Sequence, residues 1–276
     1  MQVNIADHGY TIIYNGVYYF ALSDYPNISG WELKKLLTFM GYEKQHGRET
    51  EIVCEDDKIL TAVNYAIAHP QKFAAVSLPG KITECTACKQ KGCLTKFVCH
   101  TASAESAVNI FSGGKLLSAV KALGKTSLEL VGDKRNACGD PADFFDYIMF
   151  AWGNCSAGDR LVMERSIDID PDNFHIFEEA LENSLAPGAR FYFKYENIVK
   201  HPGYVFDGYH PAKIKDELTF ADCLYACVIP QQYKSRFEGL LPPEIADRIH
   251  FLPQNSLGLF DWTEKVYNFI QGLEEN

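Results

Sequence analysis

The sequence lacks several features that would place it in a specialised class. No apolar run approaches the ~20 residues of a membrane-spanning helix, and the N-terminal residues lack the basic start and apolar stretch of a signal peptide. Internal repeats and low-complexity stretches are also missing, as are a Walker A loop, a Gly-x-Ser-x-Gly turn and a His-Glu-x-x-His zinc motif. We therefore expect a globular protein with no membrane contact and none of these common catalytic motifs.

Positive charge is scarce, because 26 Lys and Arg face 36 Asp and Glu, for a net charge of −10. This acidity argues against extended binding to duplex DNA, which needs many phosphate contacts. Residues 81–135 are the exception: nine basic minus four acidic residues give +5, so the remainder carries −10 − 5 = −15. The basic zone indicates an anionic ligand at one site, or else a chance cluster on a solvated face.

The 276 residues, 47% of them hydrophobic, suffice for one large domain or two modest ones, each with its own core. Nine cysteines are an odd number, and no secretory signal accompanies them. We therefore expect a reducing, cytoplasmic environment.

The first 80 residues predict a small α+β domain. Residues 10–20 are typical of a β-hairpin around Asn15-Gly16, and Ser29 begins a helix with Glu32 as its capping-box partner. A second helix is predicted over residues 58–69 and a short strand over 74–78. The boundary falls in a cysteine-rich junction at residues 81–99.

The remaining residues, 81–276, predict a second α+β domain. Its strands are expected at 94–100, 147–152, 160–165, 190–194, 213–220 and 224–229, and its helices at 103–111, 127–134, 141–145, 231–239, 242–247 and 261–272. Several strands alternate polar and apolar residues, which favours antiparallel sheets with one wet face.

One stretch of this second part carries a recognisable pattern. A strand ends in His100-Thr101, a helix with Val108 and Ile110 follows, and Gly113-Gly114-Lys115-Leu116 comes next. The pattern resembles the opening of diphtheria-toxin-like ADP-ribosyltransferases, and in particular the DarT-type nucleic-acid enzymes. It is more distantly similar to RNA 2′-phosphotransferases. The resemblance covers residues 95–232, about half the chain, and implies an ADP-ribosyltransferase-like fold of split antiparallel sheets with flanking helices.

The resemblance also implies residues for an NAD site. His100 and Thr101 would hold the ribose beside nicotinamide, Tyr147 and Phe150 would form the wall for nicotinamide, and Arg135 would hold a phosphate; Glu217 would be the catalytic carboxylate. Two departures from the pattern are an extra residue before Leu116 and Gly153-Asn154 in place of an arginine after the aromatic strand.

Strand alternation supports Glu217 further, because it places Lys215, Glu217 and Thr219 on one polar face and turns Asp216 toward the apolar side. A structural alternative exists for each residue. His100 would be an ordinary hydrogen-bonded histidine, Glu217 an edge-strand charge that aids solubility, and Tyr147 and Phe150 plain core residues.

Four thiols in the junction, Cys85, Cys88, Cys93 and Cys99, could hold a structural zinc ion. The first pair has zinc-knuckle spacing, and Cys99 could join if its side chain faces away from His100. The alternative is a set of free thiols whose pKa values nearby lysines lower.

The resemblance implies NAD as substrate and transfer of ADP-ribose to a nucleic-acid base, in a toxin or phage-defence role. A single-stranded acceptor suits the acidic chain better than a duplex, and a protein or small-molecule acceptor stays open. The alternatives are a non-catalytic binding module on the same fold and an RNA 2′-phosphotransferase, which would need arginines such as Arg135, Arg160 or Arg190.

Overall fold

The structure is a computed structural model that describes residues 1–7, 11–12, 16–79, 96–133, 136, 139–166, 187–221 and 223–274. The chain is a mixed α+β protein that forms two compact units. Unit 1 contains Met1–Thr95, Lys125–Asp146 and Val205–Lys213, and unit 2 contains Lys96–Gly124, Tyr147–Tyr204 and Ile214–Asn276. The first unit thus combines the N-terminal region with two segments from much later in the sequence.

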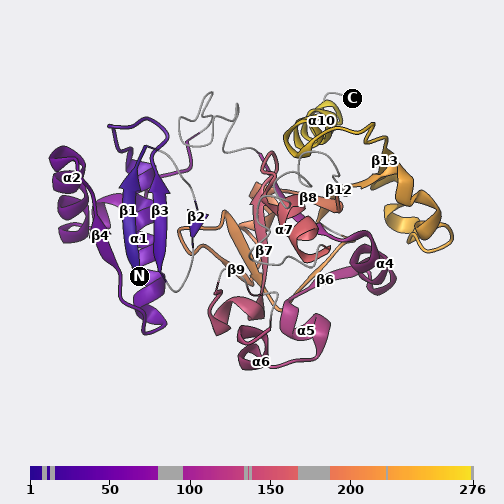
Figure 1. The fold of residues 1–276 in the computed structure, drawn as a ribbon, viewed down its shortest axis with the longest axis horizontal. Coiled ribbons are helices and arrows are strands. Elements are labelled where there is room, and N and C mark those ends of the chain that lie inside the picture. The colour runs from indigo at the N-terminus through magenta and orange to yellow at the C-terminus, as the bar shows by residue number, and fades with distance from the viewer. Residues whose placement is uncertain are drawn as a thin grey trace, which may run out of the picture. The chain divides into compact units, whose positions relative to one another are not determined.

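Unit 1 has a small mixed sheet. Its strands are β1 (Gln2–Ala6), β2 (Thr11–Ile12), β3 (Val17–Ala21) and β4 (Glu51–Val53), in the order β2-β3-β1-β4 (Figure 1). β2 and β3 pair antiparallel, which confirms the predicted hairpin, whereas β1 lies parallel to both β3 and β4. Val3, Tyr18 and Phe20 are fully or almost fully buried in this sheet.

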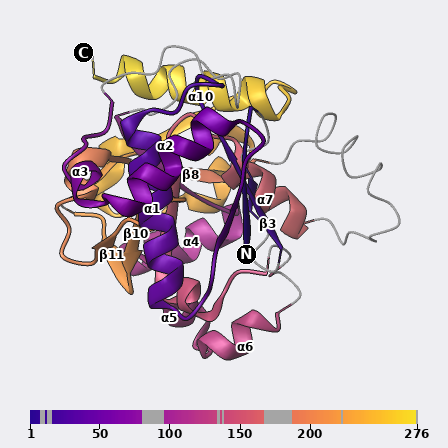
Figure 2. The same cartoon turned by 90° about the vertical axis from the view of Figure 1, so that its left-hand side faces the viewer.

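The helices of unit 1 begin where the sequence predicts. α1 (Gly30–Gln45) starts at Ser29, whose side chain forms the predicted capping box with Glu32. α2 (Asp57–Ala68) is capped by Asp56, and both helices can be followed in Figure 2. The strand predicted over residues 74–78 is wrong, because the short helix α3 (Gln71–Ala74) ends there and residues 75–79 form neither a helix nor a strand. The later segments add α6 (Ser127–Val131) and the 3-10 helix η1 (Ala142–Asp146).

Unit 2 contains most of a large mixed sheet with the strand order β13-β12-β8-β5-β7-β10-β9. Its strands are β5 (Phe97–Ala102), β7 (Tyr147–Trp152), β8 (Ala189–Lys194), β9 (Tyr204–Val205), β10 (Ala212–Lys215), β12 (Leu224–Pro230) and β13 (Ile249–Leu252). β5 pairs antiparallel with β7 and β8, and β12 pairs antiparallel with β8 but parallel with β13. A separate two-stranded antiparallel sheet joins β6 (Lys115–Leu117) to β11 (Glu217–Thr219).

The helices of unit 2 are α4 (Ala104–Gly113), α5 (Ala119–Leu123), α7 (Ala157–Ser166), α9 (Tyr195–Ile198) and α10 (Leu259–Gly272), with the 3-10 helices η3 (Gln231–Phe237) and η4 (Pro243–Arg248). The strand predicted over 160–165 is wrong, because these residues belong to α7. Ser103 caps α4, and Gly114, with a φ of 64°, ends it in the left-handed conformation that glycine adopts without strain.

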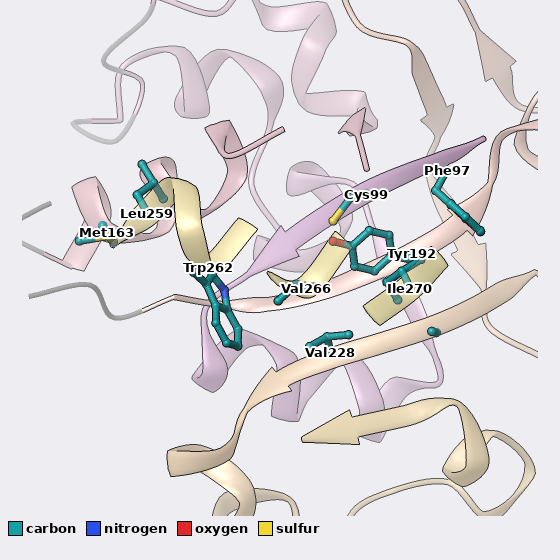
Figure 3. Packing of buried hydrophobic residues seen from close by; sticks show 10 residues of the cluster. Phe97, Cys99, Met163, Tyr192, Val228, Leu259, Trp262, Val266 and Ile270 are labelled. Carbon is teal, nitrogen blue, oxygen red and sulfur yellow. The ribbon is translucent and has the colours of Figure 1, made fainter. Parts of the chain in front are cut away.

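Two apolar layers enclose the large sheet of unit 2. On one face, Trp262, Val266 and Ile270 of α10 pack with Cys99 and Tyr192 of the sheet (Figure 3). On the other, the Phe111 ring of α4 lies 5.3 Å from Phe191 and 5.9 Å from Phe237. These three residues of α10 are four positions apart, which places them on one face of the helix, and this apolar face covers the sheet. Within the described parts of the chain, no helix is long and apolar enough to cross a membrane.

Candidate active site

Three segments that the sequence predicts for one site are neighbours in the large sheet of unit 2. β5, which carries His100 and Thr101, pairs with β7, which begins at Tyr147. β10 follows β7 in the strand order and leads to Glu217, and β11 itself contacts β7. Elements that lie far apart in the sequence therefore come together around β7.

His100 is half-buried near the end of β5. Its Nδ1 lies 3.0 Å from the carbonyl oxygen of Met149, and its ring is 6.2 Å from that of Phe150. A carbonyl can only accept, so the hydrogen bond assigns the proton to Nδ1 and leaves Nε2 as the acceptor nitrogen in the neutral ring. The neighbouring strand thus fixes both the tautomer and the orientation of the imidazole.

Thr101 lies on the opposite face of β5 from His100, because successive side chains alternate across a sheet. It sits opposite Arg190 of β8, and its Oγ1 lies 3.9 Å from the Cys99 sulfur. A Cβ on Gly158 would come within 2.3 Å of this oxygen, so α7 approaches the sheet very closely here. The expectation that His100 and Thr101 hold one ribose together requires the same face, and their side chains do not share one.

The two aromatic residues of β7 are separated in the same way. Phe150 is 1% exposed and packs edge-on against Phe193 at 5.5 Å, which favours the core-packing alternative for this residue. Tyr147 is half-buried and, three positions earlier in the strand, faces the other side of the sheet. A nicotinamide wall made of both rings is therefore incompatible with β7 as it is formed, and Tyr147 is the one with an accessible ring.

Glu217 begins β11 as a partly exposed carboxylate. The single strand predicted over 213–220 is interrupted at Asp216, whose φ of 64° separates β10 from β11. Beyond the break the predicted alternation holds, because Glu217 and Thr219 are exposed while Leu218 is buried.

Lys115 of β6 donates a hydrogen bond to Glu217, with 2.8 Å between Nζ and Oε2. The hydrogen bond and the charge of Lys115, helped by the charge of Lys121, lower the pKa of Glu217. The side chain of Glu217 is 47% exposed, so the ionised carboxylate is available to a ligand. The sequence analysis includes Lys115 in the motif Gly113-Gly114-Lys115-Leu116 but does not predict its contact with Glu217. The contact arises from the pairing of β6 with β11, which are about 100 residues apart and share no sequence pattern.

The cysteine and arginine predictions lie mainly outside the described residues. Cys85, Cys88, Cys93 and Arg135 all fall there. Cys99 is described: it lies in the core beside Tyr192, whose hydroxyl turns toward its sulfur in Figure 3, and burial raises the pKa of its thiol. A zinc site that used Cys99 would have to reach this interior position. Among the described residues, no group of three or more His, Cys, Asp and Glu is placed to hold a metal ion.

A buried ion pair that no sequence pattern predicts lies under α7. Asp159 is fully buried, and its Oδ2 lies 3.5 Å from Nε of Arg190, which is itself 1% exposed. Asp159 also accepts from the backbone N–H of Gly188, while Arg190 donates to the Cys155 carbonyl at 2.6 Å. Arg190 therefore has no access to a substrate phosphate, which removes it from the arginines that a phosphotransferase would use.

Comparisons of the chain with models of protein families, with curated proteins and with solved structures found no match.

Proposed function

We propose that unit 2 is an NAD-dependent ADP-ribosyltransferase in which Glu217 is the catalytic carboxylate and His100 contacts the ribose. The observation that carries the proposal is the strand order β5-β7-β10, in which the strand of His100 lies beside β7, and β7 lies beside the strand that leads into Glu217. The sequence resemblance predicted these three segments separately. The finer ADP-ribosyltransferase fold is part of the same proposal.

The reaction breaks the bond between C1′ of the ribose and the nicotinamide nitrogen. The bonding electron pair leaves with nicotinamide, and positive charge develops on the ribose as in glycoside hydrolysis. A nucleophilic atom of the acceptor then forms a new bond to C1′, and its proton passes to solvent. A fixed carboxylate close to the ribose stabilises the transition state more than the ground state, because the ribose carries positive charge only in the transition state.

The surroundings of Glu217 and His100 suit these roles. Lys115 keeps the pKa of Glu217 below its ordinary value, so the carboxylate is charged at neutral pH. Nδ1 of His100 donates to the Met149 carbonyl, so Nε2 is set to accept from a ribose hydroxyl. Phe150 shares the face of His100 but is buried, and Tyr147 faces the other side of the sheet, so we assign no residue of β7 to nicotinamide.

The acceptor is proposed to be a base in single-stranded nucleic acid, as the resemblance implies, in a toxin or phage-defence role. The net charge of −10 limits extended contact with a duplex, while one unpaired base needs few phosphate contacts. Incubating the protein and labelled NAD with single-stranded DNA, duplex DNA or RNA tests this part separately from NAD cleavage.

The decisive variant is Glu217→Gln, which keeps the side-chain size and removes the charge. We expect NAD consumption to fall by about 10²–10³-fold, while NAD affinity measured by calorimetry stays close to that of the wild type. The matched control is Glu264→Gln, an exposed glutamate of α10, which should leave turnover unchanged. Wild-type turnover in the Glu217 variant, or no heat from a folded wild-type protein at millimolar NAD, would overturn the assignment.

A further inference from the structure

One end of the large sheet, where β5 and β12 begin and β7 and β8 end, carries aromatic side chains that are only half-buried. Trp152 ends β7, Tyr195 follows β8, and Tyr225 lies near the start of β12. The Trp152 and Tyr195 rings are 5.2 Å apart, with 49° between their planes. At this angle neither ring covers the face of the other, so each can present a face to a flat ligand.

The Trp152 ring lies on the same face of the sheet as His100. Trp152 pairs with Val98 of β5, and His100 is two positions beyond Val98 in that strand. Side chains two positions apart in a strand share a face and are about 6.6 Å apart along it. A ligand that extends from His100 along this face therefore meets the tryptophan and the tyrosine beside it.

Hydrogen bonds hold the two rings in place. The Tyr195 backbone N–H donates to the Lys96 carbonyl at 2.8 Å. The Gly153 N–H, directly after the tryptophan, donates to the Phe97 carbonyl at 2.9 Å. The Tyr195 hydroxyl also forms a side-chain hydrogen bond with Tyr204. A pair of rings that is already ordered costs a ligand little conformational entropy on binding.

Two lysines lie at the same end of the sheet. Lys96 precedes β5 with a side chain that is 80% exposed, and Lys194, opposite Phe97, ends β8. Nζ of Lys194 is 5.2 Å from the centroid of the Tyr225 ring. Glu274 faces both ammonium groups, at 3.4 Å from Lys96 and 3.5 Å from Lys194. One carboxylate cannot neutralise two ammonium groups, so this part of an acidic chain keeps a positive charge.

The chemistry of this end of the sheet fits single-stranded nucleic acid. Every base has a face that can stack on an aromatic ring, and the phosphates between bases bind ammonium groups. The exposed Glu196 and Lys200, in and just after the short helix α9, add one charge of each sign and leave the balance positive. A duplex hides the faces of its bases and needs many phosphate contacts, which so few lysines do not supply.

We propose that these aromatic residues and lysines form one binding surface for the acceptor strand. We call it the aromatic–lysine surface, and its members are Trp152, Tyr195, Tyr225, Lys96 and Lys194. Nucleotides next to the reacting base stack on its rings, and their phosphates bind its lysines. This inference rests on the proposed function and deepens it, because it gives the single-stranded acceptor a place on unit 2.

Binding of a labelled single-stranded DNA or RNA of mixed sequence, about 12 nucleotides long, tests the surface by fluorescence anisotropy without NAD. Trp152→Leu removes the ring and keeps an apolar side chain, and we expect Kd to rise at least about tenfold. Trp152→Phe keeps a ring and should bind nearly as tightly as the wild type. The matched control is Phe260→Leu, which removes a 71% exposed ring of α10 outside the surface and should leave Kd unchanged.

Lys96→Gln tests the charged part of the surface. For a single strand, each contact between an ammonium group and a phosphate contributes about 0.7 to the slope of log K against log salt concentration. We expect Lys96→Gln to weaken binding and to reduce this slope by about 0.7. The control is Lys234→Gln, an exposed lysine of η3, which should change neither quantity.

Three results would overturn the inference: no binding of either single strand by the folded wild type, wild-type affinity in Trp152→Leu, or tighter binding of a duplex of the same length. If circular dichroism shows that Trp152→Leu does not fold, Tyr195→Leu takes its place with the same expected loss. Because NAD is absent, the outcome does not depend on turnover. A wild type that binds the strand through Trp152 but does not consume NAD supports the surface and contradicts the proposed reaction.

Discussion

Glu217 and Asp159 are both acidic residues of unit 2 with a basic partner, but their surroundings differ. The Glu217–Lys115 pair is half-exposed at 47% and 36%, so water and salt screen it and it contributes little to stability. The Asp159–Arg190 pair is buried at 0% and 1%. Its charges must stay paired because the interior cannot solvate them. The exposed pair can rearrange when a ligand binds, whereas the buried pair has a structural role.

Replacing Lys115 with glutamine should change the pH dependence of the proposed reaction. The pKa of Glu217 is lowered by Lys115, so removing the ammonium raises it toward the ordinary carboxyl value. The carboxylate is then lost at a higher pH as the solution is acidified. We expect the acidic limb of the kcat/KM profile for NAD to move to higher pH.

The control for this experiment is Lys234→Gln, an exposed lysine of η3. Titrating the Glu217 carboxyl by NMR gives the same information without turnover. An acidic limb and a titration that both stay in place in Lys115→Gln would show that the ion pair does not tune Glu217.

At the scale of elements, the sequence predicts a helix or strand correctly where the pattern that identifies it lies within that one element. The capping box at Ser29, the apolar run of β7 and the helical stripe of α10 are such signals, and all three elements form as predicted. The strand predicted over 160–165 is wrong because a short alternation of polar and apolar residues, typical of a strand, occurs here within the helix α7. Among the residues of this run whose side chains the structure describes, Met163 packs in the core, while Leu161 is 42% exposed. One of the buried residues of α7 is an acid, Asp159. Its apolar residues therefore do not repeat at the spacing by which a helix is recognised in a sequence.

The attachment of α7 to the sheet should depend on Asp159. Asp159→Asn leaves the buried guanidinium of Arg190 without its counter-charge, which typically costs about 3–5 kcal/mol. We expect a loss of this size in the free energy of unfolding measured with urea. The control is Asp261→Asn, an exposed residue at the start of α10, for which we expect a loss below about 1 kcal/mol.

A double variant separates charge pairing from packing. Asp159→Leu combined with Arg190→Met removes both charges and keeps apolar volume, and it should recover much of the stability lost in Asp159→Asn. Equal stability of Asp159→Asn and the wild type would mean that the pair carries no net charge interaction in the fold.

At the scale of the whole molecule, the sequence predicted an N-terminal α+β region but not the later segments that join it. Tyr42 and its partners show why: its hydrogen bonds reach Asp143, 101 positions away, and Lys213, 171 positions away. Contacts at such separations leave no periodicity or motif in one sequence. The candidate site shows the same limit. Its strands could be predicted one by one, whereas their order in the sheet and the break at Asp216 could not.

The charge network of unit 1 should make the protein sensitive to acid. The pKa values of Asp207 and Asp143 are lowered in the folded state, against burial, by His210 and Lys213 in one case and by Arg48 and Tyr42 in the other. A carboxyl with a lowered pKa stabilises the fold fully above its unfolded value of about 3.9. This contribution is lost as the pH falls through the folded value. Stability should therefore decline steeply as the pH falls below about 4.

Asp207→Asn isolates the largest part of this effect. We expect it to lower the free energy of unfolding at pH 7 by on the order of 2 kcal/mol and to flatten the decline between neutral pH and pH 2. Urea unfolding at a series of pH values gives the measurement, with the exposed Asp247→Asn as control. Parallel curves for Asp207→Asn and the wild type would show that Asp207 is not the charged centre of the network, and the acid sensitivity would then belong to Asp143.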